Sequence, residues 1–247
     1  MMGLSLVLIG TTASAREGVI LLHGLCRTSA SMNRMEASLR ESGYFVLNVG
    51  YPSRTANIRE LSNDAIGAAL RNEEIRTCSK VHFVTHSLGG ILVRSYFSEH
   101  KQGRLGRVVM LAPPNQGSEV IDKIGSWKIV QKVNGPAGGE LTTDPNSTPN
   151  RLGPINFECG VITGDRSINW INSLMIPGKD DGKVSVARTD FAGVKEHRVF
   201  HVTHPFIMKN KRVIQETVHF LKVGHFSPQN GSQSRRPSCP ISISSRR

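Results

Sequence analysis

One serine lies between two elements that the sequence predicts on either side of it. The run KVHFVTHSLGGILV joins an apolar, β-rich stretch at 80–85 to a helical pattern at 88–98. Ser87 falls at the junction, so the chain must turn sharply there. Open parallel sheets place their sites at the edge where such turns lie. The Ser87 hydroxyl could therefore be a nucleophile, with the first N–H groups of the helix stabilising developing negative charge.

A serine nucleophile needs partners elsewhere in the chain. The hydroxyl is hardly ionised at neutral pH, so a base must take its proton. A histidine performs this role when a carboxylate on its other nitrogen fixes the correct tautomer and orientation. The sequence has nine histidines and 19 acidic residues. The hypothesis therefore depends on which of them the fold brings to Ser87.

The elements that must position these residues alternate between two patterns. Buried strands are predicted at 18–23, 44–49, 80–85, 107–112, 157–163 and 198–202. Helical spacing is present at 31–40, 57–76, 88–98 and 212–221. Continuous apolar strands alternating with helices predict an α/β fold with a mostly parallel central sheet and helices on both faces. The last strand is expected to include His201.

The chain of 247 residues fits one domain, predicted at 16–225, with three segments of separate character. Residues 1–15 have an apolar run and an Ala-Ser-Ala ending that resemble a signal peptide, which predicts export, with a cytoplasmic protein as the alternative. The long connection 113–154, with an amphipathic piece at 120–133, is interpreted as a cap insertion or a structural excursion. Residues 226–247 are predicted to be a disordered basic tail.

Composition limits the partners and cofactors. The net charge of +12 comes from scattered basic residues, which favours a solvated basic surface and no nucleic-acid partner; a weak attraction to membrane surfaces is the alternative. No metal motif and no dinucleotide or P-loop motif is present, so no cofactor is expected. The four cysteines form no C-x-x-C pair, and Cys26 and Cys159 are expected to be buried.

Two motifs give the chain a family resemblance. Thr85-His86-Ser87-Leu88-Gly89 resembles the G-x-S-x-G nucleophile elbow of the α/β-hydrolase superfamily, with Thr85 in place of the first glycine. The T-H-S-L-G-G run is similar to that of small bacterial lipases and esterases. Leu22-His23-Gly24-Leu25 resembles the H-G pair of their oxyanion loop. The resemblance extends from Arg16 to His225 and implies a minimal lipase-like hydrolase.

The resemblance assigns roles to individual residues. It implies backbone N–H donors from Leu25 and Leu88 to an oxyanion, with His23 as a structural member of the loop. The base of the family follows the last strand, and His204 fits that place best. The acid lies after the penultimate strand, where three carboxylates compete. Asp181 in D-G-x-V matches the lipase pattern, Asp165 directly follows the strand, and Asp180 is the third alternative.

The resemblance implies ester hydrolysis through an acyl-enzyme, with a small-molecule or lipid ester as substrate. An acyltransferase or thioesterase could use the same three residues, since a fold does not determine its reaction. A non-catalytic protein that binds lipid or envelope polymer through its basic surface is the alternative from another class. The acyl chain length and the oligomeric state are not readable from the sequence.

Overall fold

The computed structural model describes residues 16–101, 103–125, 127–167 and 179–228. Its centre is a six-stranded sheet in the order β2-β1-β3-β4-β5-β6, and every neighbouring pair of strands is parallel. The strands are β1 Gly18–Leu22, β2 Phe45–Val49, β3 Val81–His86, β4 Leu105–Leu111, β5 Cys159–Gly164 and β6 Glu196–Phe200. The predicted parallel α/β sheet is therefore confirmed.

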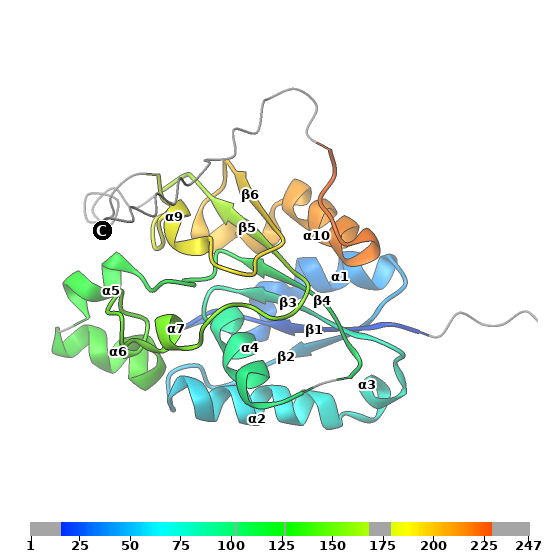
Figure 1. Cartoon of the computed structure of the whole chain (residues 1–247), viewed down its shortest axis with the longest axis horizontal. Helices are drawn as coiled ribbons and strands as arrows, with labels where there is room; N and C mark the ends of the chain where they lie inside the picture. Colours follow the sequence, from blue (N-terminus) through cyan, green and yellow to red (C-terminus); the bar gives the residue numbers. More distant parts are fainter. Residues whose placement is uncertain (1–15, 102, 126, 168–178, 229–247) are drawn as a thin grey trace, which may run out of the picture.

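Helices cover both faces of this sheet (Figure 1). Helices α1 (Asn33–Glu41) and α10 (Lys211–Val223) pack on one face, where their buried residues join Val19, Leu21 and Val84. Helices α2 (Ile58–Arg71) and α4 (Leu88–Glu99) pack on the other, around Ile20 and Phe83. The buried strands β1 and β3 have apolar residues on both sides because both of their faces are covered.

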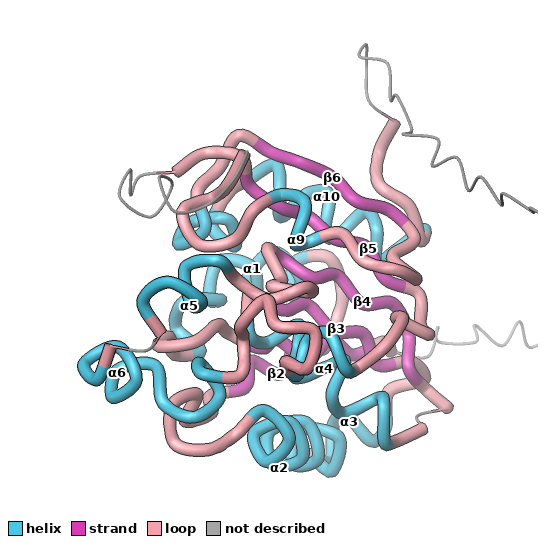
Figure 2. Tube along the Cα trace, turned by 60° about the vertical axis from the view of Figure 1, so that its left-hand side comes forward, coloured by secondary structure: helices cyan, strands magenta, loops and turns pink. Residues whose placement is uncertain are grey.

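The connection 113–154 contains three helices, α5 (Glu119–Ile124), α6 (Lys128–Gly139) and α7 (Thr148–Arg151). The amphipathic piece predicted at 120–133 is thus divided between two helices. Both views place α5 and α6 beyond the carboxyl ends of the strands (Figures 1 and 2). The N–H of Ala137 donates to the carbonyl of Ala56, and the Cys26 thiol donates to Val133. The connection therefore lies over the loops that follow β1 and β2.

Some local expectations were wrong. The helix predicted at 57–76 is interrupted at Asn72, whose side chain caps the separate helix α3 (Glu73–Thr77). Strand β6 ends at Phe200, so His201 lies just outside it. Cys26 is exposed, not buried, because the loop after β1 turns it outward with φ of 57°, whereas Cys159 is buried as expected. Cys26, Cys78 and Cys159 are all free thiols.

The ends of the predicted domain fall partly outside the described residues. The signal-peptide interpretation at 1–15 and most of the predicted tail, 229–247, lie there. Phe226, the first residue of that predicted tail, is buried against Phe220 with 4.8 Å between ring centroids. The folded part thus continues past 225. Among the described residues, no helix combines the length and the apolar character needed to cross a membrane.

Candidate active site

Ser87 occupies a strained turn between β3 and α4. Its backbone has φ of 51° and ψ of −120°, in a region that residues with a Cβ rarely adopt. Such a conformation costs about 1–3 kcal/mol and persists only where the surroundings enforce it. The Ser87 N–H donates to the carbonyl of Leu111 in the neighbouring strand at 2.8 Å. Its side chain makes no capping hydrogen bond to α4, so the hydroxyl is left available at the sheet edge.

Two glycines make room for this turn. A Cβ on Gly89 would lie 2.7 Å from the carbonyl oxygen of Leu22, which is backbone and cannot easily move. A Cβ on Gly24 would lie 2.7 Å from Nδ1 of His86 and 3.1 Å from Cβ of Ser87. The turn can therefore approach β1 and the loop after it only because both positions lack a side chain.

His204 and Asp181 form a buried pair. Nδ1 of His204 lies 2.7 Å from Oδ2 of Asp181, and the His204 N–H donates to the Asp181 carbonyl at 2.9 Å. Both residues are almost completely buried. The pair brings together the sequence-predicted base and acid. A carboxylate accepting from Nδ1–H leaves the other ring nitrogen, Nε2, as the proton acceptor.

The loop that carries Asp181 is shaped by its sequence, D-G-K-V. Gly182 has φ of +98°, a backbone conformation that favours glycine, and it forms the turn directly after Asp181. Oδ1 of Asp181 accepts from the N–H groups of Lys183 at 3.1 Å and Val184 at 3.0 Å, and Val184 is buried. A Cβ on Gly164, the last residue of β5, would lie 3.0 Å from Cβ of Asp181. Asp181 thus lies against the end of β5 although it comes 17 positions later in the chain.

The two rival carboxylates have other partners. Oδ1 of Asp165 accepts from Nδ1 of His201 at 2.9 Å, and this histidine is exposed. Asp165 also lies 3.9 Å from the Lys179 ammonium. Oδ1 of Asp180 accepts from the N–H of Gly182. Among the three candidate carboxylates, Asp181 is the one whose bond to His204 the structure describes.

His23 is held in the loop after β1 by hydrogen bonds and by ring stacking. Nδ1 of His23 donates to the carbonyl of Gly24 at 2.9 Å, and Nε2 accepts from the N–H of Tyr51 at 3.3 Å. The two rings stack with centroids 4.1 Å apart, and burial lowers the pKa of His23. His23 is therefore held neutral and its two nitrogens are occupied, as expected for a structural residue.

Leu25 and Leu88, the expected oxyanion donors, lie in the two turns that meet here. Leu88 is the first residue of α4, where an N–H has no acceptor within the helix. Within the described ranges, neither the Leu25 N–H nor the Leu88 N–H donates to another residue. Both groups can thus serve a bound oxygen, and their turns are neighbours across Gly24 and Ser87.

Sequence reasoning missed His86, which joins the two halves of the site. Its Nε2 lies 3.1 Å from the carbonyl oxygen of His204, and the two rings have centroids 4.8 Å apart. Because a carbonyl only accepts, Nε2 of His86 must be the donor. Burial and the neighbouring His204 hold the pKa of His86 well below its usual range. Its place between Thr85 and Ser87 in the motif was the only signal available.

Comparison with solved structures finds the same arrangement of elements in lipolytic enzymes. The mature lipase BlEst2 of Bacillus licheniformis superposes with a TM-score of 0.66 at 18% identity, covering 86% of this chain and 94% of that one. Phospholipase PlaB of Legionella pneumophila gives 0.69 at 16% identity, with 86% of this chain and 60% of PlaB covered. A metagenomic carboxyl esterase gives 0.57 at 15% identity, covering 79% and 66%. This chain has the α/β-hydrolase fold.

At this level of identity the likeness is one of fold. No family model and no curated protein matches the sequence. The chain spans 60% of the length of PlaB, so the larger enzyme has parts with no counterpart here. Within the α/β-hydrolase fold, Ser87, Asp181 and His204 follow β3, β5 and β6 respectively.

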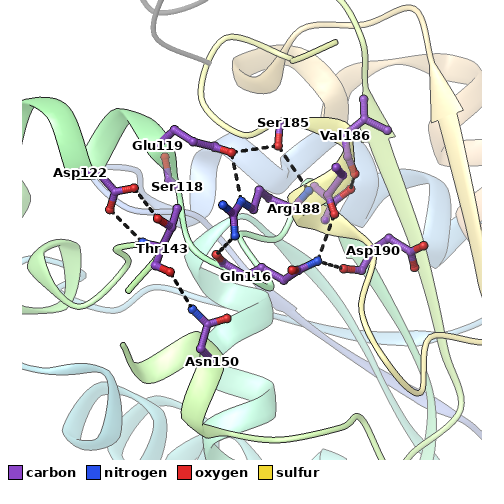
Figure 3. A network of polar contacts seen from close by, with 12 residues as sticks. Gln116, Ser118, Glu119, Asp122, Thr143, Asn150, Ser185, Val186, Arg188 and Asp190 are labelled. Carbon is purple, nitrogen blue, oxygen red and sulfur yellow. Dashed lines mark hydrogen bonds and ion pairs between the residues drawn. The ribbon is translucent and has the colours of Figure 1, made fainter. Parts of the chain in front are cut away.

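A polar network connects residues 185–190, which follow the Asp181 loop, to the long connection 113–154 (Figure 3). Oε1 of Glu119 accepts from Nε of Arg188 at 3.0 Å and from the Ser185 hydroxyl at 3.2 Å. The Ser118 hydroxyl donates to the carbonyl of Lys183 at 2.8 Å. Helix α9 (Val186–Thr189) and the Asp181 loop are therefore braced by the start of α5. No sequence pattern indicated this contact.

In the part of the chain that the structure describes, no group of three or more histidine, cysteine or acidic side chains is arranged to bind an ion. The same edge of the sheet carries a hydroxyl at a strained turn, a buried imidazole–carboxylate pair and two backbone N–H groups without a described acceptor. This set can perform nucleophilic acyl transfer.

Proposed function

We propose that this chain is a serine carboxylic-ester hydrolase, an esterase or lipase. The observation that carries the proposal is the buried bond of 2.7 Å between His204 and Asp181, joined through His86 to the strained turn at Ser87. A buried carboxylate bonded to Nδ1 of an imidazole beside a serine on such a turn is the arrangement used for acyl transfer. The lipolytic enzymes among the structural neighbours add support.

The first half of the proposed reaction forms an acyl-enzyme. Nε2 of His204 takes the proton of the Ser87 hydroxyl as its oxygen attacks the ester carbonyl. The carboxylate of Asp181 stabilises the imidazolium that results. The N–H groups of Leu25 and Leu88 donate to the oxyanion of the tetrahedral intermediate. Each such donor contributes about 3–4 kcal/mol to lowering the barrier. His204 then protonates the leaving alcohol, and Ser87 retains the acyl group.

The second half releases the acid. His204 takes a proton from water, which attacks the acyl carbonyl, and the tetrahedral intermediate again uses the two N–H donors. Collapse of the intermediate returns the proton from His204 to Ser87 and frees the carboxylic acid. No redox change is involved, and the residues of the site end as they began.

The connection 113–154 is proposed to act as a cover beside the acyl site. A Cβ on Gly138 in α6 would lie 3.1 Å from Cδ2 of Leu25, so α6 touches the residue proposed to donate to the oxyanion. Trp127 and Val133 are large exposed apolar residues of the same segment. Apolar side chains there suit the acyl part of an ester and would influence the preferred chain length.

Hydrolysis of p-nitrophenyl esters of increasing acyl length tests the proposal, with wild type beside Ser87→Ala. Ser98→Ala, an exposed serine on the same helix, is the matched control. We expect activity and fluorophosphonate labelling in wild type and control, and neither in Ser87→Ala. Equal activity in all three proteins would exclude Ser87 as the nucleophile. Labelling together with transfer to added alcohols in preference to water would indicate an acyltransferase instead.

A further inference from the structure

A cavity lies beside the loop that contains His204, on the side of the sheet covered by α1 and α10. It has a volume of about 570 Å³. Its walls come from the start of α1, the end of β5, the loop that contains His204 and the start of α10. The lining residues are Arg34, Arg166, His201, Val202, Thr203, Phe206, Lys209, Asn210 and Lys211. The Arg166 N–H donates to the carbonyl of Val202, which joins two of these walls.

The cavity is at the sheet edge that carries the proposed catalytic residues. Helices α1 and α10 begin there, each after a strand that ends there. Thr203 and Phe206 flank His204 in sequence, within two residues of it. A group bound in the cavity would therefore be held close to the proposed base, not on a distant face.

The charge of this cavity is strongly positive. Four side chains with permanent positive charge, Arg34, Arg166, Lys209 and Lys211, line it, and no carboxylate is among its described lining residues. None of the four forms an ion pair with a described residue. The carboxylate of Asp165, which is bonded to the lining residue His201, also lies 3.9 Å from the Lys179 ammonium. Four unpaired cations around one hollow repel each other and attract an anion.

The position of Lys211 at the start of α10 also favours a bound anion. The N-terminal end of a helix carries partial positive charge, so acidic residues are stabilising in the first turn and basic residues are not. α10 is 13 residues long, has no acidic residue in its first turn, and begins with Lys211 directly after Lys209 and the cap Asn210. Lys209 ends the preceding 3-10 helix, His204–Lys209, where a cation is favourable, but Lys211 lies where a cation costs stability. A bound anion would reverse that cost.

Phe206 indicates what kind of anion fits. Its side chain is among the few exposed large apolar ones, at 54% exposure, and it lies on the rim of the cationic cavity. Basic side chains around an exposed aromatic ring are the combination that binds the interface of an anionic membrane, where the ring enters the acyl boundary and the cations contact phosphate. A soluble phosphate would use the cations but not the ring.

We propose that this cavity binds the headgroup phosphate of an anionic phospholipid in a membrane surface, with Arg34, Arg166, Lys209 and Lys211 as phosphate contacts and Phe206 inserted beside them. The role in bringing lipid ester to Ser87 rests on the proposed function, whereas the binding itself does not. The cavity lies next to His204, so a protein held in this way has its proposed catalytic edge facing the lipid.

Vesicle co-sedimentation of the full chain tests whether the cavity binds anionic phospholipid. The protein carries Ser87→Ala so that no lipid is hydrolysed. The vesicles contain phosphatidylcholine alone or equal parts of phosphatidylcholine and phosphatidylglycerol. We expect the partition coefficient to be at least about tenfold higher on the anionic vesicles. Lys209→Gln with Lys211→Gln should lower it about tenfold or more, and Phe206→Ala should lower it on the same vesicles. Arg34→Gln, on another helix, repeats the test independently.

The matched control removes two positive charges, as the double lysine variant does, but from another part of the surface. Arg76→Gln with Lys101→Gln alters two exposed cations at the opposite edge of the sheet. A control that loses as much binding as the cavity variants would overturn the site, as would equal partition onto neutral and anionic vesicles. Calorimetry with glycerol phosphate separates the two sources of phosphate. Tight binding of this soluble ligand, lost in the cavity variants and without preference for vesicles, would overturn the lipid assignment.

Discussion

Nε2 of His86 donates to the backbone carbonyl of His204 at 3.1 Å, so the residue that precedes the proposed nucleophile holds the residue that carries the proposed base. The contact is buried, and the other nitrogen of His86, Nδ1, has no partner among the described residues. Burial lowers the pKa of His86 strongly, so this ring stays neutral and keeps its proton on Nε2. His86 is thus a positioning residue and not a second base.

Replacing His86 should reduce turnover more than substrate binding. His86→Leu leaves the His204 carbonyl buried without a donor, which should cost about 1–3 kcal/mol of stability. Because the imidazole of His204 loses its anchor, we expect kcat to fall about tenfold with little change in KM. Ester hydrolysis and thermal unfolding measure the two effects.

Two further variants separate a positioning role of His86 from a general effect of removing a histidine. His86→Gln can still donate from its amide and should recover part of kcat. His100→Leu removes the bond of an exposed histidine to the Tyr96 carbonyl and serves as the matched control. The positioning role is wrong if His86→Leu and His100→Leu have the same kcat.

Stability should decrease as the solution becomes acidic, before carboxylates titrate. Four histidines, His23, His82, His86 and His197, have lowered pKa values, with burial as the main cause. In the unfolded chain their pKa is about 6.5. Between the folded and unfolded values the unfolded state binds more protons. The contribution of these residues is therefore complete above about pH 6.5 and is lost as the pH falls below it.

Urea unfolding at a series of pH values measures this effect. We expect the free energy of unfolding to be level above about pH 7 and to fall steadily from about pH 6.5 to pH 5. A free energy that stays constant through that window would contradict the burial of neutral histidines.

Asparagine substitutions test the roles of Asp181 and Asp165, two aspartates that are each bonded to a histidine. In Asp181→Asn the amide cannot hold His204 in the same tautomer, and we expect kcat to fall about 10³- to 10⁴-fold. Asp165→Asn changes the contacts with the exposed residues His201 and Lys179 and should leave kcat within about twofold. Measurement of ester hydrolysis at saturating substrate decides between them. If Asp165→Asn abolished turnover while Asp181→Asn spared it, the acid would be misassigned.

The sequence predicted the strands and the motifs well because both are local. A buried parallel strand is a continuous apolar run, and the elbow at Ser87 requires a strand, a small turn and a helix in immediate succession. The Asp181 loop was also readable, since Gly182 permits the turn and Val184 anchors it. In each case a few adjacent residues determine the local structure.

The remaining contacts join residues distant in sequence. The partner of His86 is 118 positions away, and Ser118 reaches the Lys183 carbonyl across 65 positions. Such hydrogen bonds leave no periodic pattern and no spacing rule. The break of the helix at Asn72 was missed for a different reason: the apolar positions on both sides fit one helical period, but the Asn72 side chain caps a new turn.

Arg94 should determine how firmly the long connection is attached. It is a buried residue of α4, and burial lowers its pKa to about 10, so it is still charged at neutral pH. Its guanidinium donates to the carbonyl oxygens of Asn115, Pro149 and Gly153 and lies over the Phe191 ring. Both ends of the connection 113–154 are therefore held by one side chain.

Arg94→Leu would leave these carbonyl groups without a donor, and Arg94→Lys cannot form the same fork. We expect Arg94→Leu to lose about 3 kcal/mol or more of stability and Arg94→Lys to lose somewhat less. Limited proteolysis should cut first within 113–154. Arg59→Leu, which removes an exposed arginine paired with Glu99, is the control and should change stability by less than about 1 kcal/mol. Equal stability of Arg94→Leu and Arg59→Leu, with unchanged cleavage sites, would show that Arg94 does not hold the connection.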